Sequence, residues 1–183
     1  MSRIFIKIII FLTSFLTFGQ QVDKIEIIPK GVKGFLVRDF DNKSEAEIYK
    51  SIKDWTEYNI KNASFATNSN VNNEFITFKV NNVGIIHFKN KPTWSLNLYV
   101  EIRIKPYKAR IDIEILEIDG IKENQSSLNI VGANVIMGLY KKNGKPVSGY
   151  RQTREEINKI LNEFAEQIFQ SVNGNKDYKK DDW

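Results

Sequence analysis

Apolar and polar side chains alternate along the middle of the chain more regularly than anywhere else. Every even-numbered residue from 94 to 104 is apolar, and the odd-numbered residues between them are polar, charged or tyrosine. Successive side chains of a strand point to opposite faces of a sheet, so residues 94 to 105 are predicted to form a strand with one buried face. After a turn at Pro106, residues 111 to 115 alternate in the same way. Leu116 then breaks the phase, which predicts a β-bulge near Ile115.

Three shorter segments carry the same alternation earlier in the chain. Residues 22 to 28 alternate between apolar and charged side chains before a proline and a glycine, and they predict a first strand. Residues 74 to 80 and residues 83 to 89 each place apolar side chains on one face. Because Asn81 and Asn82 lie between these two segments, the pattern predicts two strands joined by a tight turn.

The first helix is predicted between the first and second strands, after a loop through residues 38 to 41. Ser44 and Glu47 have the spacing of a capping box, in which each side chain bonds the backbone of the other residue. The apolar residues that follow at helical spacing are Ile48, Ile52 and Trp55. This helix is expected to end near Lys61.

A second helix is predicted at the end of the chain. Thr153 and Glu156 again have capping-box spacing, and Gly174 is well placed to terminate the helix. The apolar residues of one helical face are Ile157, Ile160, Leu161, Phe164, Ile168 and Val172. Because both helices have a single apolar face, each is expected to pack against the sheet.

The predicted order of elements is β-α-β-β-β-β-α, which indicates an α+β fold. A sheet with one apolar face and two helices with one apolar face each are most simply combined with both helices on one side of an antiparallel sheet. Residues 119 to 152 form a segment without sustained periodicity. Such a length is unusual in a compact domain, so part of this segment is expected to pack or to form short structure of its own.

The first nineteen residues have the pattern of a secretory signal peptide. Arg3 and Lys7 precede an apolar run from residue 8 to residue 18, which stops at Gly19. A membrane-spanning helix needs about 20 apolar residues, so a stable membrane anchor is not expected after signal cleavage. The predicted organisation is a signal peptide at residues 1–19, one domain at 20–172 and a charged, disordered tail at 173–183. Export predicts a periplasmic or secreted protein.

Composition narrows the possible functions. Loss of Arg3 and Lys7 with the signal peptide lowers the formal net charge from +5 to +3, which is too small to indicate a polyanionic partner. The chain has no cysteine. This excludes disulfides, thiolate metal sites and cysteine nucleophiles, and it excludes the lipid-modified cysteine of a bacterial lipoprotein.

The order of elements resembles a known family. Trp55 lies late in a first helix that opens with an acidic capping box, and four strands and a long C-terminal helix follow behind an export signal. In these features the chain resembles exported bacterial proteins described as a domain of unknown function with a TBP-like fold. The resemblance covers residues 22 to 117 best, leaves residues 119 to 152 unaccounted for, and contains no catalytic motif. It implies the fold and no activity, and a shared fold does not transfer DNA binding.

The charges on the polar side of the strands also argue against nucleic acid. Glu101, Asp112 and Glu114 are interleaved with Arg103 and Arg110, so this side lacks the basic field that phosphates require.

Catalytic and metal-binding chemistry is sparse in the sequence. His87 is the only histidine, so neither a Ser-His-Asp triad nor a histidine zinc cluster is expected. The densest acidic cluster, residues 39 to 47, lacks the spacing of a calcium loop, and helix capping explains it. The sequence therefore predicts no catalytic residue, no metal site and no cofactor.

What remains is a candidate binding surface on the side of the sheet opposite the helices. The residues predicted to share it are Phe75, Thr77, Ile85, His87, Tyr99, Arg103 and Arg110. Aromatic side chains beside hydrogen-bonding groups are typical of surfaces that recognise partners. Alternatively, the apolar residues 128 to 140 fold over this side and make it a second small core.

Two functions of different classes fit these observations. The first is a non-catalytic binding or interaction domain of the cell envelope, which uses this side of the sheet and the loop from residue 121 to residue 150. Its partner is an envelope protein or a small ligand. The second is a small-molecule carrier or hydrolase with a pocket between the sheet and residues 119 to 152. In that case His87, Arg103 and Asp112 are the polar groups that would act in the pocket.

Overall fold

The computed structural model describes residues 24–60, 64–65, 73–89, 91–121, 130–131, 135–136 and 138–174. The predicted signal peptide and the tail beyond residue 174 lie outside these residues, and both stay predictions. Within the described ranges, no helix combines the length and the apolar character needed to cross a membrane.

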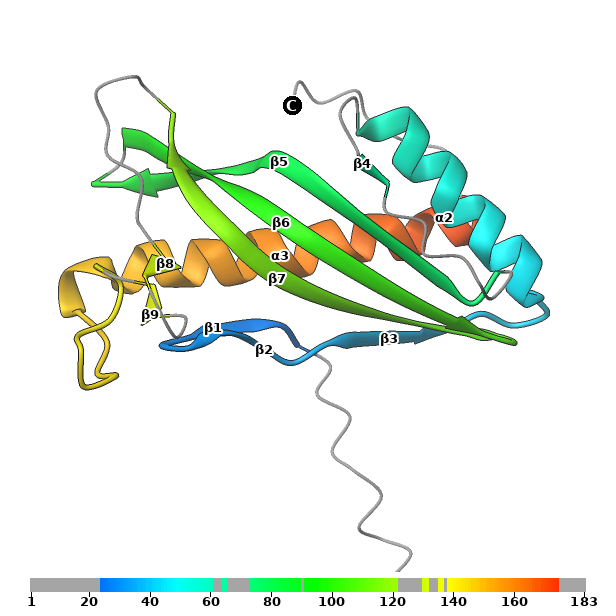
Figure 1. Cartoon of the computed structure of the whole chain (residues 1–183), viewed down its shortest axis with the longest axis horizontal. Helices are drawn as coiled ribbons and strands as arrows, with labels where there is room; N and C mark the ends of the chain where they lie inside the picture. The colour runs from blue at the N-terminus through cyan, green and yellow to red at the C-terminus, as the bar shows by residue number, and fades with distance from the viewer. Residues whose placement is uncertain are drawn as a thin grey trace, which may run out of the picture.

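The centre of the fold is a five-stranded antiparallel sheet in the order β3-β7-β6-β5-β4 (Figure 1). Its strands are β3 (Leu36–Asp39), β4 (Ser64–Phe65), β5 (Phe75–Phe88), β6 (Lys91–Lys105) and β7 (Lys108–Gly120). The predicted alternation in β6 is confirmed, because every even-numbered residue from 94 to 104 is buried. The predicted bulge is also confirmed. Asn97 pairs with Glu117 while Leu98 pairs with Ile115, so Leu116 is the extra residue.

The predicted tight turn at Asn81 and Asn82 is wrong, since both residues lie inside the single strand β5. Val80 pairs with Leu98 and Val83 with Leu96, so the register shifts here without a reversal of the chain. Asn82 adopts a φ of 60° and Gly84 a φ of 65°. Positive φ is usual in turns but also occurs at bulges, where it bends a strand without ending it. The two predicted strands are therefore two arms of one bent strand.

The region before the first helix contains more strand than the sequence predicted. β1 (Glu26–Ile28) pairs with β2 (Gly31–Lys33) in a separate two-stranded sheet. The predicted loop through residues 38 to 41 is wrong at its start, because β3 pairs with β7 from Leu36↔Ile111 to Asp39↔Lys108. A strand of four residues is too short to show a reliable alternation, and its identity comes from its partner.

The first helix, α2 (Glu45–Asn59), confirms its predicted cap. Ser44 accepts from the Glu47 amide at 3.3 Å, and the Ser44 amide donates to the Glu47 carboxylate at 2.8 Å. The carboxylate also accepts from the Ser44 hydroxyl at 2.8 Å, and its bonds with the Ser44 backbone and then with this hydroxyl lower the pKa of Glu47. The predicted apolar face is buried, with Ile48, Ile52 and Trp55 each at most 5% exposed.

The second helix, α3 (Arg151–Val172), begins two residues before Thr153. The predicted capping box is wrong, because Tyr150 is the N-cap residue and no side chain caps the helix. Thr153 and Glu156 instead bond His87 of β5. The predicted apolar face is confirmed at five positions, which are almost completely buried: Ile157, Leu161, Phe164, Ile168 and Val172. Ile160 is half-buried and lies against Gly84.

Both helices cover the same face of the sheet, as predicted, and α3 runs behind the long strands in Figure 1. They also contact each other, with Trp55 and Phe164 in an edge-on arrangement at 6.0 Å between ring centroids. α3 additionally holds the first strand. Asn158 and Asn162 accept from the amides of Ile27 and Ile25 at 2.8 and 2.9 Å. These amides would otherwise lack a partner, because β1 is paired only with β2.

The segment after β7 forms short elements, as expected. They are β8 (Ile130–Val131), β9 (Val135–Ile136) and the 3-10 turn η1 (Ser148–Tyr150). Leu139 is fully buried in the main core. Tyr140 donates its hydroxyl to the carbonyl of Ile27 at 2.8 Å, and Arg154 donates to the carbonyls of Leu139 and Val147. Residues 138 to 150 are therefore attached to β1 and to the start of α3.

Candidate functional site

The side of the sheet away from the helices is called the open face below. It is formed by alternate residues of β5, β6 and β7: Phe75, Thr77, Lys79, Tyr99, Glu101, Arg103, Arg110, Asp112 and Glu114. Five of the seven predicted binding residues are among them. The strand pairing places Phe75, Arg103 and Arg110 in one row across the three strands.

The arginines of the open face are held by acids two residues away on their own strands. Arg103 donates to Glu101 with Nε at 2.7 Å, and Arg110 binds Asp112 through two nitrogens at 2.7 and 2.5 Å. The bond to Asp112 raises the pKa of Arg110. The guanidinium carbon of Arg110 lies over the ring of Phe35, 3.7 Å from the centre of that ring. The open face is therefore nearly balanced in charge, with rigidly placed guanidinium groups.

The five residues differ in how far a partner could reach them. Thr77 is only 3% exposed, so it supports the open face rather than offering a contact. Phe75, Tyr99 and Arg110 are half-buried, and the Arg103 side chain is 55% exposed. The accessible predicted residues are thus an aromatic pair and two arginines, which are types common at binding hot spots.

Ile85 and His87 do not join the other five, and this part of the predicted site is wrong. Both lie past the bulge in β5, and His87 aligns with Pro92 whereas Phe75 aligns with Arg103. Roughly 40 Å of extended strand separates the two places. The His87 amide and ring nitrogen Nδ1 both contact the Glu156 carboxylate at 2.7 Å. His87 therefore joins the edge of β5 to α3.

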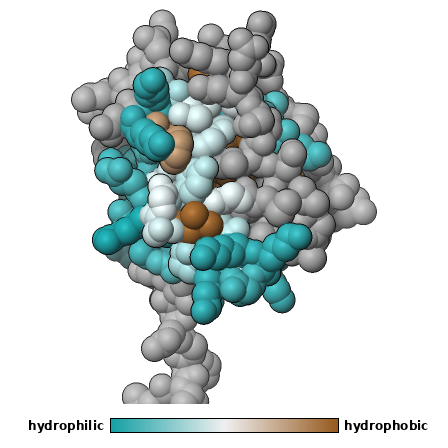
Figure 2. All heavy atoms as spheres, turned by 90° about the vertical axis from the view of Figure 1, so that its left-hand side faces the viewer, coloured by the Kyte–Doolittle hydropathy of each residue, from teal (hydrophilic) through white to brown (hydrophobic). Residues whose placement is uncertain are grey.

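The far end of β5 offers little apolar surface for a partner. Figure 2 faces the end of the molecule where β5 ends and α3 begins, and its coloured surface is mostly hydrophilic or neutral with small hydrophobic areas. The rings of Phe88, Trp94 and Tyr150 contact one another there, with Phe88 and Tyr150 stacked at 4.9 Å. Trp94 is 6% exposed, so this aromatic cluster belongs to the core.

The polar groups of the hydrolase hypothesis are not assembled. His87 is bound to Glu156 at one end of the sheet, whereas Asp112 is bound to Arg110 on the open face. General acid-base catalysis requires the reacting groups to be within hydrogen-bond reach of one substrate. No group of three potential metal ligands occurs in the part of the chain that the structure describes.

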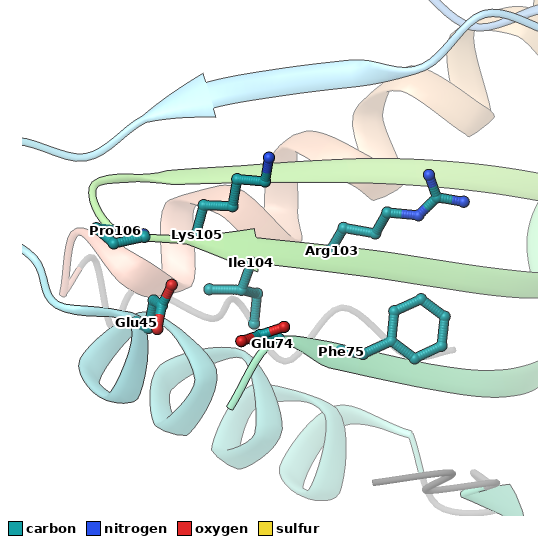
Figure 3. A pocket seen from close by; sticks show the side chains of 7 residues that line it. All are labelled: Glu45, Glu74, Phe75, Arg103, Ile104, Lys105 and Pro106. Atoms are coloured by element: carbon teal, nitrogen blue, oxygen red, sulfur yellow. The ribbon is translucent and has the colours of Figure 1, made fainter. Parts of the chain in front are cut away.

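A pocket of about 560 Å³ lies at the corner of the sheet and is called the notch below (Figure 3). Its lining comes from α2, from the start of β5 and from the end of β6: Glu45, Glu74, Phe75, Arg103, Ile104, Lys105 and Pro106. Phe75 and Arg103 were predicted as binding residues, whereas the other five were not. No sequence signal brings Glu45 of a helix to a strand end, because only the packing of α2 does so.

A second pocket of about 400 Å³ lies between β2 and the middle of β7. It is lined by Lys30, Gly31, Val32, Ile113, Glu114, Ile115 and Leu116. β2 belongs to a separate sheet and lies beside β7 without pairing to it. Among the described residues of 119 to 152, none lines either pocket, so neither matches the pocket that the carrier or hydrolase hypothesis expected.

Comparisons with known proteins identify the fold. No family model and no curated protein matches the chain. A crystal structure of a TBP-like protein from Parabacteroides distasonis is similar with a TM-score of 0.60 and 11% identity, covering 80% of this chain and 96% of that one. A DUF4468 family protein from Bacteroides ovatus has a TM-score of 0.53 and 14% identity, over 82% and 88% of the two chains. The chain therefore has an α+β TBP-like fold, as predicted, and identities this low show the fold alone.

Proposed function

We propose that this protein is an exported, non-catalytic binding domain that recognises an envelope protein through the open face. The observation that carries the proposal is the row of Phe75, Arg103 and Arg110, with Tyr99 beside it, on a sheet surface opposite both helices. Its export rests on the pattern of the first nineteen residues.

The shape and charge of the open face favour a protein as the partner. A surface across three long strands gives a partner protein many contacts, whereas small molecules are usually bound in concave pockets. Each arginine is accompanied by an acid, so the open face as a whole lacks the excess of positive charge that a polyanion requires. Half-buried aromatic rings beside fixed guanidinium groups are typical of the centre of protein interfaces.

Residues 138 to 150 are attached elsewhere, which supports the availability of the open face. They contact β1 and the start of α3 through Tyr140 and Arg154. The last residues of the apolar segment 128 to 140 therefore do not form a second core over the open face, which supports the binding surface. Residues 122 to 129, 132 to 134 and 137 lie outside the described residues.

Site-specific photo-crosslinking tests the proposal. A photoreactive phenylalanine analogue replaces Tyr99 on the open face or Tyr58 on α2, which is 75% exposed. After irradiation in intact cells, a discrete crosslinked envelope protein is expected from position 99 and not from position 58. Cell fractionation of the same samples should place the protein outside the cytoplasm.

The identified partner then allows a matched affinity measurement. Tyr99→Lys with Arg103→Glu should abolish binding, whereas Tyr58→Lys with Lys50→Glu on α2 makes the same charge change and should leave the Kd unchanged. Both pairs of variants must unfold cooperatively, as shown by circular dichroism. Equal crosslinking from both positions, or equal binding by both double variants, would refute recognition through the open face.

A further inference from the structure

The notch exists because β6 is longer than its partner at this corner. Phe75 is the first residue of β5 and pairs with Arg103. Beyond that pair, the Ile104 amide donates to the Glu74 carbonyl at 2.8 Å, and β5 begins only after Glu74. Residues 104 to 106 therefore extend past β5, and the first turn of α2 lies across the gap, as Figure 3 shows.

The floor of the notch is apolar. Ile104 is 2% exposed and belongs to the main core, so its position is rigid. The ring of Phe75 and the side chain of Pro106 complete the apolar lining. At about 560 Å³ the notch falls within the range of roughly 300–1,000 Å³ that is usual for small-ligand pockets.

Charged groups of opposite sign line different sides of the notch. Glu45 and Glu74 lie on the side of α2, whereas Arg103 and Lys105 extend from β6 in another direction (Figure 3). Among the described residues, Glu45, Glu74 and Lys105 form no ion pair, although four charges are gathered at one corner. Arg103 binds Glu101 through Nε and one terminal nitrogen, which leaves its other terminal nitrogen available.

This distribution of charge selects a class of ligand. A simple anion would be repelled by the two carboxylates, and a simple cation by Arg103 and Lys105. A molecule with an ammonium group, a carboxylate and an apolar part between them would satisfy both sides and the floor. We propose that the notch binds a short peptide with free ends, its amino group at Glu45 and Glu74 and its carboxylate at Arg103 and Lys105.

This proposal goes beyond recognition of an envelope protein by the open face and can be tested separately. Glu45, Glu74 and Lys105 belong to the notch and are not among the residues changed in the partner-binding test. The probe is the tripeptide Ala-Leu-Ala with free ends. Three blocked forms of it carry an N-terminal acetyl group, a C-terminal amide, or both. Isothermal titration calorimetry with the purified protein measures the four Kd values.

The free tripeptide is expected to bind most tightly. Each blocking group should weaken binding about threefold, and both together about tenfold, because partly exposed ion pairs contribute modestly. Equal Kd values for the free and doubly blocked peptides would show that the charged ends are not recognised. Absence of any binding up to millimolar peptide by cooperatively folded protein would overturn the proposal as well.

Variants assign the two ends. Glu74→Gln should remove the discrimination against the acetylated peptide and leave the discrimination against the amide, and Lys105→Gln should do the reverse. Glu114→Gln and Lys79→Gln on the open face are matched controls, since both side chains are exposed and neither lines the notch. If Glu74→Gln and Lys105→Gln leave the discrimination unchanged, or if the controls weaken binding as much, the assignment of the notch is wrong.

Discussion

The covered face and the open face of the sheet are built from alternate residues of the same three strands, yet their side chains are held in different ways. On the covered face, Phe78, Val100 and Ile113 form a row that is at most 6% exposed and lies beneath the helices. On the open face, the corresponding row from Phe75 to Arg110 keeps contact with solvent. Burial fixes the first row, and ion pairs within β6 and β7 hold the two arginines of the second.

This difference separates stability from recognition. Apolar burial contributes roughly 25 cal/mol per Å² removed from water, whereas an exposed ion pair contributes about 1 kcal/mol at most. Substitutions on the covered face are therefore expected to change the free energy of unfolding, and substitutions on the open face to change binding while the fold is retained. Four experiments test this division, from the largest expected effect to the smallest.

Phe78→Ala should cause the largest loss of stability. Phe78 is fully buried at the centre of the covered face, and its truncation leaves a cavity that the surrounding strands cannot fill. The free energy of unfolding should fall by about 3–5 kcal/mol, as measured by urea denaturation. Lys79→Ala, on the next residue and the opposite face, should change it by less than about 0.5 kcal/mol. Similar losses in both variants would contradict the division between the faces.

Gly84→Ala tests the bend through which β5 reaches α3. A Cβ at this position would lie 2.7 Å from Cγ2 of Ile160, and the φ of 65° disfavours any side chain. The free energy of unfolding should fall by about 1–3 kcal/mol in this variant. Adding Ile160→Ala to the same chain should relieve the steric part of that loss. Gly149→Ala is the control, because a Cβ there meets no atom within 4 Å. Thermal unfolding of the four chains gives the result, and equal Tm values would rule out the close contact.

Ser44→Ala should cost about 1 kcal/mol, because it removes the acceptor for the Glu47 amide at the start of α2. The cost should depend on pH. The pKa of Glu47 is lowered in the folded state, so the stability that its carboxylate contributes is present above the unfolded pKa and is lost as the pH falls through the folded pKa. The gap between Ser44→Ala and the unchanged protein should therefore narrow in acid. Urea denaturation of both chains at a series of pH values measures this gap in the free energy of unfolding. A gap that widens as the pH falls would be inconsistent with this cap.

Arg103→Gln should have the smallest effect on folding. Its side chain is 55% exposed and its partner Glu101 lies on the same strand, so the pair contributes less than about 1 kcal/mol. The same variant should weaken both peptide binding in the notch and crosslinking from position 99, because Arg103 belongs to both proposed sites. A loss of stability comparable with that of Phe78→Ala would show that Arg103 is a structural residue.

Most errors in the predicted secondary structure have one physical origin. Asn81 and Asn82 were expected in a turn, and Thr153 and Glu156 in a helix cap, because both patterns are read from neighbours in sequence. In the fold, the edge of β5 near His87 needs hydrogen-bond partners, and Glu156 accepts from the His87 amide. A long-range bond therefore replaced the local cap.

The candidate site was predicted only in part, because local alternation places some of its residues and long-range packing decides the others. Alternation along β6 and β7 was sufficient to place Tyr99, Arg103 and Arg110 on one face. The shifts of register in β5 removed Ile85 and His87 from that face. Alternation predicts the face of a residue only while the strand is regular, and the sequence did not show where the bulges of β5 lie. The notch was not predicted, because it depends on where β5 begins and on how α2 crosses the sheet.

The sequence by itself determined the α+β class, the buried face of each long element and the interleaved charges of the open face. These features depend on residues one to four positions apart, which local periodicity reports directly. Only the tertiary structure decided that β5 is one bent strand, that β3 joins β7, and that Glu45 and Arg103 line one pocket. Those outcomes depend on distant segments that compete to satisfy the same strand edges and to cover the same apolar face.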